Sequence, residues 1–224
     1  PFFLYLAYNG PYGLGGAMEQ PIGNRHSYYA GRAFPSMPRD APHPWNFNYG
    51  KWMYNAQVRA KYAAEVSAVD EGVAEILGTL QSLVLDENTH VLFIGYHGHA
   101  GGHGGYGGMG DNTRPLTAFD WTTWIPMIFR HPGAVPAGRR SDFLVSNYDV
   151  LPSLLAFLGL DAPSVRELPG RSFEPLLRGR EQEWYYAVFY EFENVRSIRT
   201  ADWKYIERFR ASPNELYDLR NDAG

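Results

Sequence analysis

Three histidines lie in a glycine-rich segment near the middle of this chain. The segment, residues 95–110, is called the glycine loop here; more than half of its residues are glycine, and it contains His97, His99 and His103. Imidazole nitrogens can bind a transition metal, transfer a proton or, when protonated, hold an anion. The H-x-H-x3-H spacing therefore leaves a zinc or copper site and an anion site both open. Because glycine imposes little order on its neighbours, the spacing favours a specific metal site only weakly.

The elements around the glycine loop predict an α/β domain. Residues 91–94 form a short apolar run, typical of a strand buried on both faces of a mostly parallel sheet. Residues 58–80 carry apolar side chains at intervals of three and four, which predicts a helix, with Arg59 and Glu65 off its apolar stripe. With residues 2–8 as a further buried strand, these segments predict a strand–helix–strand unit with a right-handed crossover. Ligands bind at the carboxyl ends of strands in such sheets, where the glycine loop begins.

The second half of the chain predicts shorter elements. Residues 124–130 have the pattern of a strand, which Pro126 places at its start or near an edge. Ser146 or Asn147 is expected to cap a helix that ends at Gly159. After Gly179, short aromatic and β-branched segments predict a small antiparallel sheet; they are residues 188–192, 195–199 and 203–207.

Composition excludes several classes of protein. The chain has 224 residues, a net charge of -4 and 45% hydrophobic residues, so it lacks the basic character of a nucleic-acid binder. No apolar run approaches the ~20 residues of a membrane helix. The absence of cysteine excludes disulfides, a cysteine zinc site and a thiol nucleophile. Since the chain opens directly on an apolar strand pattern, we expect it to begin inside a fold and to leave sheet edges open.

A series of segments spans nearly the whole chain: PFFLYLAYNGPYG at 1–13, the helix around 62–70, the strand and glycine loop at 89–110, IPMIFRHPG at 125–133, DVLPSLL at 149–155, GRSFEPLL at 170–177, and WKY with ELYDL at 203–205 and 215–219. In this order and spacing, the segments resemble the sulfatase family, whose fold is similar to that of alkaline phosphatase. The resemblance implies an alkaline phosphatase/sulfatase-like α/β fold that lacks the family's N-terminal half. Residues 1–178 would be the C-terminal part of the α/β core, and residues 179–224 the antiparallel subdomain.

The resemblance also implies a chemistry. Sulfatases hydrolyse sulfate esters with a formylglycine nucleophile, made from Cys or Ser in a C/S-x-P-x-R motif, and with a calcium ion held by carboxylates. The motif is absent from this chain, because the similar run from Ser36 through Asp40, SMPRD, ends in Asp rather than Arg. We therefore expect the nucleophile in the missing N-terminal half, which would be the partner of this chain. The chain alone is expected to be inactive.

The positions of the family's site fall on altered residues. The resemblance places the metal ligands at Tyr96 and His97. Tyr96 stands where the family has Asp, and its neutral phenol lacks the charge that calcium prefers. The sulfate contacts would fall on Tyr12, His103 and Met109. Tyr12 replaces a histidine, and the family's lysine falls at Gly108 or Met109, depending on how the loop is aligned. Asp111, Asn112 and Arg114 follow the glycine loop closely. From proximity alone, Asp111 and Asn112 are proposed as oxygen ligands and Arg114 as an anion contact.

Two hypotheses of different class follow. In the first, the chain is part of a sulfuric ester hydrolase acting on a sulfated small molecule or glycan. In the second, it is part of a non-catalytic protein with the same fold, which binds a sulfated glycan or a metal through the glycine loop. Neither hypothesis involves nucleic acid or membrane. The family resemblance implies a periplasmic or secreted location.

Overall fold

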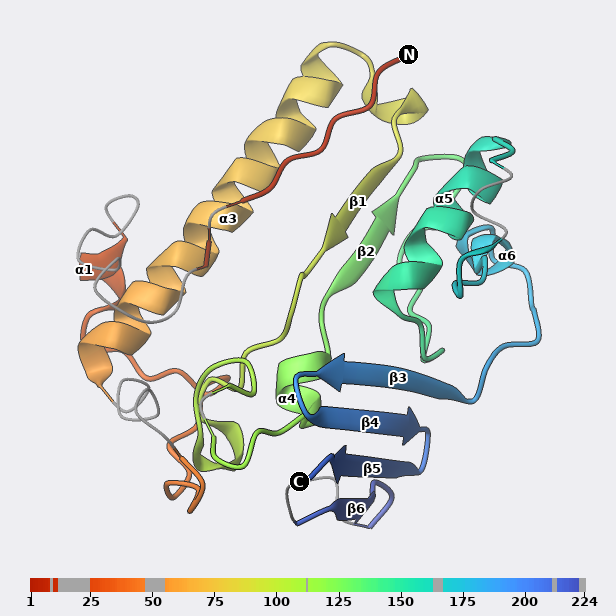
Figure 1. Ribbon diagram of the computed structural model, residues 1–224. Helices are drawn as coiled ribbons and strands as arrows, with labels where there is room; N and C mark the ends of the chain where they lie inside the picture. The colour runs from red at the N-terminus through yellow and green to blue at the C-terminus, as the bar shows by residue number, and fades with distance from the viewer. Residues whose placement is uncertain are drawn as a thin grey trace. The chain divides into compact units, whose positions relative to one another are not determined.

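The computed structural model describes residues 1–8, 10–11, 25–46, 55–111, 113–162, 167–210 and 213–221. The chain divides into two compact units, which are described separately (Figure 1). Unit 1 comprises residues 1–83 and 96–125, and unit 2 comprises residues 84–95 and 126–224. No helix among the described residues combines the length and the hydropathy that crossing a bilayer requires.

Unit 1 is built on the long helix α3 (Ala56–Ser82), which confirms the helix predicted over residues 58–80. Asn55 caps it, since its side-chain oxygen accepts the backbone N–H groups of Gln57 and Val58. The short helix α1 (His26–Tyr29) packs on α3 through a 2.7 Å hydrogen bond between the hydroxyls of Tyr29 and Ser67. Two other short elements complete the unit: the 3-10 turn η3 (His103–Gly105) and the helix α4 (Asp120–Thr123).

The buried side of α3 differs from the predicted apolar stripe. Val66 belongs to the apolar stripe of residues 58–80, yet it is 45% exposed, whereas Arg59 and Glu65, which lie off the stripe, are buried. Pro38 and Phe34 lie against the Arg59 side chain and accept its N–H groups at 3.2 and 3.4 Å. This side of the helix is therefore covered by polar backbone from a loop instead of by a sheet, and periodicity in the helix cannot reveal such a cover.

The predicted strand at residues 2–8 is not formed. The segment has no regular secondary structure, and its large side chains are exposed, with Phe3 at 86%. A strand is stable only when a neighbour takes up its backbone hydrogen bonds, and none of the described residues pairs with this segment. The segment instead runs beside α3 (Figure 1), where the Tyr8 ring lies against Gly72. The expected strand–helix–strand unit is therefore absent from the described residues.

Unit 2 contains the predicted strands at residues 91–94 and 124–130. The 3-10 turn η2 (Asp86–Asn88) leads into β1 (Val91–Ile94), and β2 (Met127–Arg130) starts directly after Pro126. The two strands pair antiparallel, with Val91 opposite Arg130. The parallel pairing that the sequence predicts is not found in the described sheets, because the only described neighbour of β1 runs in the opposite direction.

The helices of unit 2 close its hydrophobic core. The 3-10 turn η4 (Asn147–Asp149) continues into α5 (Val150–Leu158), and α6 (Glu174–Leu177) follows. Of the two predicted caps, Ser146 and Asn147, the structure has Ser146, in a capping box whose Ser146 backbone N–H donates to the buried Asp149 carboxylate at 2.8 Å. Gly159 ends α5 at φ 68°, in the left-handed region that glycine adopts without strain. The core is formed by Phe157, Phe173, Leu177 and Trp184.

The C-terminal sheet has four antiparallel strands in the order β3-β4-β5-β6. Its strands are β3 (Ala187–Phe192), β4 (Val195–Thr200), β5 (Trp203–Arg208) and β6 (Glu215–Asp218). The first three confirm the predicted antiparallel sheet. The fourth strand was not predicted from its strand pattern, since its four residues are too few to show a clear alternation.

Candidate functional site

The glycine loop is tightly folded. The N–H of Gly98 donates to the carbonyl of Thr122 at 3.0 Å, and a Cβ atom on Gly98 would lie 2.7 Å from the carbonyl oxygen of Trp121. Within the loop, the N–H of Ala100 donates to Gly108 at 2.9 Å. Glycine is needed here for close backbone approach, and the hydrogen bonds give the loop the order that its composition did not predict.

The three loop histidines bind three different partners. The Nδ1 atom of His97 lies 2.9 Å from the carbonyl oxygen of Gly98. In His99, Nδ1 accepts the N–H of Gly101 at 3.1 Å. The Nε2 atom of His103 lies 3.2 Å from the carbonyl oxygen of Ser36. The three rings thus have separate backbone partners, and no group of three or more His, Asp or Glu residues in the described part of the chain is arranged to hold a metal.

Tyr96 and His97, the predicted metal positions, lie side by side. Their ring centroids are 4.3 Å apart, and Tyr96 is 83% exposed. A phenol and an imidazole supply no carboxylate oxygen, whereas calcium takes several hard oxygen ligands. The described residues therefore do not fit a calcium ion on their own.

His103 is held in a fixed position between two segments. Its ring stacks on Trp121 with centroids 4.0 Å apart and an interplanar angle of 14°. The next residue, Gly104, donates its N–H to the Asp40 carboxylate at 3.0 Å. The SMPRD run, whose sequence imitates the nucleophile motif, thus packs against the glycine loop, with Met37 buried. The run therefore has a structural role in packing against the glycine loop.

Met109 and Arg114 have different capacities for anion binding. Met109 is partly exposed and uncharged, so it cannot replace a lysine. Arg114 is exposed, and its Nη1 donates to the carbonyls of Asp111 and Thr113 at 2.7 and 2.8 Å. These bonds hold the guanidinium just beyond the loop, and of the four predicted sulfate contacts only Arg114 carries a permanent positive charge. Tyr12 and Asn112 lie outside the described residues.

His99 is set apart from the other loop histidines by its burial. Its ring stacks on Tyr62 of α3 with centroids 5.1 Å apart, and its Nε2 is buried with no hydrogen-bond partner among the described atoms. The pKa of His99 is lowered to about 4, mainly by burial and further by the charge of His97, while the charge of Asp111 acts in the opposite direction. The ring is therefore neutral near pH 7 and contributes no positive charge to an anion site. Nothing in the sequence distinguishes it from its neighbours.

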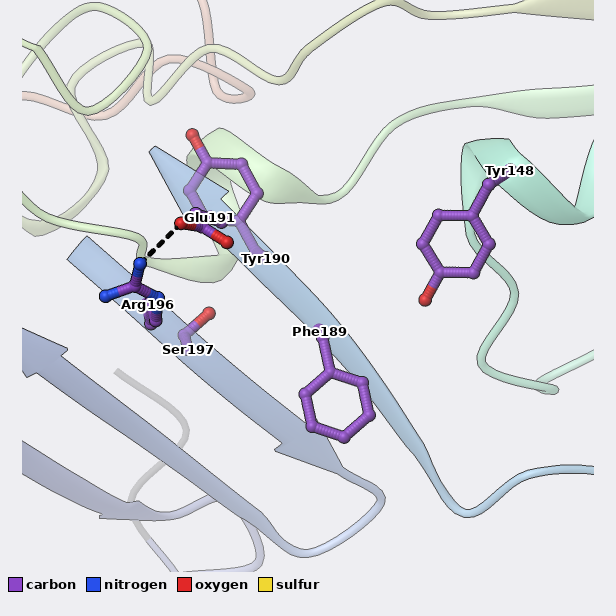
Figure 2. A pocket seen from close by; sticks show the side chains of 6 residues that line it. All are labelled: Tyr148, Phe189, Tyr190, Glu191, Arg196 and Ser197. Carbon is purple, nitrogen blue, oxygen red and sulfur yellow. Dashed lines mark hydrogen bonds and ion pairs between the residues drawn. The ribbon is translucent and has the colours of Figure 1, made fainter. Parts of the chain in front are cut away.

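Unit 2 has a hollow of about 340 Å³ beside β3, called the β3 pocket (Figure 2). Its lining residues are Tyr148, Phe189, Tyr190, Glu191, Arg196 and Ser197. Tyr148 faces β3 from the far side of the opening, and Glu191 pairs with Arg196 at 2.7 Å (Figure 2). Because this ion pair neutralises the arginine, the pocket suits an uncharged group with an apolar face better than an anion.

Two family models match the chain. A model described as Sulfatase matches residues 1–160. A model described as N-sulphoglucosamine sulphohydrolase, C-terminal, matches residues 117–224. The two matches overlap and together cover all 224 residues.

Curated relatives and solved structures give the same picture. N-acetylglucosamine-6-O-sulfatase of Bacteroides thetaiotaomicron is 28% identical over 191 residues, which cover 76% of this chain and 31% of the relative. N-acetylgalactosamine-6-sulfatase of Canis lupus familiaris is 30% identical over 151 residues, which cover 65% of this chain and 28% of the relative. A structure solved in complex with its substrate D-glucosamine-2-N,6-O-disulfate matches with a TM-score of 0.68 and 27% identity, over 77% of this chain and 36% of that chain. The chain thus spans about a third of the length of these curated relatives.

Proposed function

This chain belongs to the sulfatase family, and from that premise we propose that it is the C-terminal portion of a sulfuric ester hydrolase. The observation that carries the proposal is the sulfatase model, which matches residues 1–160. The fold class expected from the sequence, an alkaline phosphatase/sulfatase-like α/β fold, is confirmed at the level of the family. We propose further that residues 1–178 contribute to the α/β core and residues 179–224 form its antiparallel subdomain.

The residues present in this chain indicate which parts of the catalytic site it would supply and which parts the rest of the polypeptide would supply. Hydrolysis of a sulfate ester requires a nucleophile and positively charged donors around a dense oxyanion. This sequence has no C/S-x-P-x-R segment, so the nucleophile would come from the rest of the sulfatase polypeptide. The chain would supply sulfate contacts from Arg114 and His103, whose positions are fixed by the bonds described above. Tyr12 and Met109 are the other proposed contacts.

We propose a sulfated saccharide as the substrate class. The support is that several relatives are named for sulfated sugars and that the similar structure was solved with D-glucosamine-2-N,6-O-disulfate. The periplasm or the cell exterior is the proposed location. A non-catalytic glycan binder is the second candidate, favoured by the replacement of the family's ligand Asp with Tyr96.

The chain alone is expected to release no sulfate from 4-nitrophenyl sulfate, because it lacks the nucleophile. A polypeptide that joins it to a sulfatase N-terminal half containing C/S-x-P-x-R should release sulfate, measured by the absorbance of 4-nitrophenol. The control is the same polypeptide with the Cys or Ser of that motif replaced by Ala. Turnover by the chain alone would contradict the proposal that the nucleophile lies outside it. An inactive joined polypeptide that still binds sulfated saccharides would favour the non-catalytic glycan binder.

Sulfatase membership suggests the usual metal dependence, and we propose that Tyr96 and His97 stand at the metal position. In the joined polypeptide, Tyr96→Asp should strengthen calcium binding by restoring an anionic oxygen ligand. Isothermal calorimetry measures the affinity, and Tyr96→Asn serves as the control because it adds an oxygen without a charge. If both variants bind calcium as the parent does, Tyr96 is not a metal ligand.

A further inference from the structure

Unit 1 contains a hollow of about 440 Å³ that the sequence did not predict, called the arginine pocket. It lies between residues 31–39 and the start of α3. Three arginines line it, Arg32, Arg39 and Arg59, and none of its described lining residues is acidic. The rest of the lining consists of Gly31, Ala33, Phe34, Pro35, Met37 and Pro38.

Arg59 carries a buried positive charge that no described carboxylate neutralises. It is 3% exposed, and its N–H groups donate to the backbone carbonyls of Pro38 and Phe34. Among the residues that the structure describes, no acidic side chain forms an ion pair with it. A buried charge is costly unless it is paired, so an anion in the pocket would relieve this cost. Burial and the charge of Arg39 both lower the pKa of Arg59, because each disfavours the charged form of its guanidinium.

Arg32 and Arg39 add charge at the exposed side of the pocket. The Nε of Arg32 donates to the carbonyl of Tyr28 at 2.7 Å, and its guanidinium lies 3.8 Å from the centroid of the Tyr28 ring. These two contacts fix the plane of the guanidinium. Arg39 is exposed, and no acidic residue in the described ranges pairs with it. Asp40, its neighbour in sequence, is turned toward the glycine loop, where it accepts the N–H of Gly104.

The arginine pocket borders the glycine loop. A Cβ atom on Gly102 would lie 2.2 Å from the carbonyl oxygen of Pro38 and 3.9 Å from Nη1 of Arg59. The carbonyl of Ser36 contacts the ring of His103, a proposed sulfate contact, so the segment that lines the pocket also contacts this residue. The β3 pocket differs in kind, since its single arginine is already neutralised by Glu191.

We infer that the arginine pocket binds a sulfate group carried by a saccharide, separate from the sulfate that is hydrolysed. The three guanidinium groups supply N–H donors suited to an oxyanion. The volume lies within the range of about 300–1,000 Å³ that takes a small-molecule ligand, so a sugar ring can accompany the sulfate group. The saccharide part of the assignment rests on the proposed function, while the oxyanion part rests on the pocket alone.

Isothermal calorimetry of the 224-residue chain with sucrose octasulfate tests this inference. We expect sucrose octasulfate to bind and sucrose not to bind. Inorganic sulfate and inorganic phosphate are titrated separately, and each should bind more weakly than sucrose octasulfate. Arg39→Ala should weaken the binding of sucrose octasulfate about 10-fold or more, because one hydrogen-bonded charge is removed. Arg140→Ala removes the same charge from an exposed site in unit 2 and should change the affinity less than 2-fold.

The outcomes distinguish binding in the arginine pocket from diffuse electrostatic attraction, and they do not depend on turnover. Equal weakening by Arg39→Ala and Arg140→Ala would overturn the pocket, since it would mean diffuse attraction of a polyanion. Inorganic sulfate or phosphate binding as tightly as sucrose octasulfate would overturn the saccharide assignment. Arg59→Gln is the second variant, checked for folding by circular dichroism, and it should also lose binding. Because no step uses hydrolysis, inactivity of the joined polypeptide leaves this test unaffected.

Discussion

Acidification from pH 7 to pH 4 should cost this chain about 3 kcal/mol of unfolding free energy through His99 alone. The folded-state pKa of His99 is about 4 and its ordinary value is 6.5. The unfolded chain therefore binds a proton that the folded chain excludes throughout this range. The stability due to the neutral ring is complete above pH 6.5 and is lost as the pH falls toward 4. The cause is burial against Tyr62, which makes a charged imidazole unfavourable.

Urea unfolding at several pH values between 7 and 4 measures this loss. His99→Asn is the matched variant, because its amide oxygen can still accept the N–H of Gly101 and it does not titrate. His97→Asn, at the exposed neighbouring histidine, is the control and should keep most of the slope of the parent, because burial is a larger cause of the His99 shift than the charge of His97. Burial and His131 also lower the pKa of His90, so the difference between the parent and His99→Asn isolates the effect of His99. Identical slopes for parent and His99→Asn would show that His99 is not buried.

Gly105→Ala should destabilise unit 1 by about 3 kcal/mol, the sum of about 1 kcal/mol for a left-handed alanine and about 2 kcal/mol for overpacking. Gly105 has φ +78°, and a Cβ atom there would lie 1.8 Å from the carbonyl oxygen of Ala41 and 2.7 Å from the backbone nitrogen of His43. Both neighbours are backbone, so they cannot rotate away. The substitution would also disturb the 2.8 Å hydrogen bond from the His43 N–H to Gly105.

Gly31→Ala is the matched control, since Gly31 has a similar φ of +73° and no atom within 4 Å of the added Cβ. It should cost only the backbone term of about 1 kcal/mol. Chemical denaturation of both variants at pH 7 gives the comparison. Equal losses would mean that the glycine loop does not pack on residues 41–43.

Local sequence patterns predicted the elements whose stabilising interactions lie near them in the chain. The apolar intervals of residues 58–80 predicted α3, the cap candidates Ser146 and Asn147 predicted the start of the helix leading into α5, and Gly159 predicted its end. Pro126 placed the start of β2. The order of several short segments indicated the sulfatase family, because motif spacing is a property of the chain itself. None of these inferences required knowledge of a distant contact.

Tertiary structure decided the features that depend on residues far apart in sequence. The neutral state of His99 follows from Tyr62, and the separate partners of the loop histidines include Ser36. Arg59 was expected off the apolar stripe, but Pro38 and Phe34 bury it and make it part of a cationic pocket. Residues 2–8 have the composition of a strand and yet form none, because a strand requires a partner. Burial and hydrogen-bond partners are set by packing between distant segments, so they are absent from any local pattern.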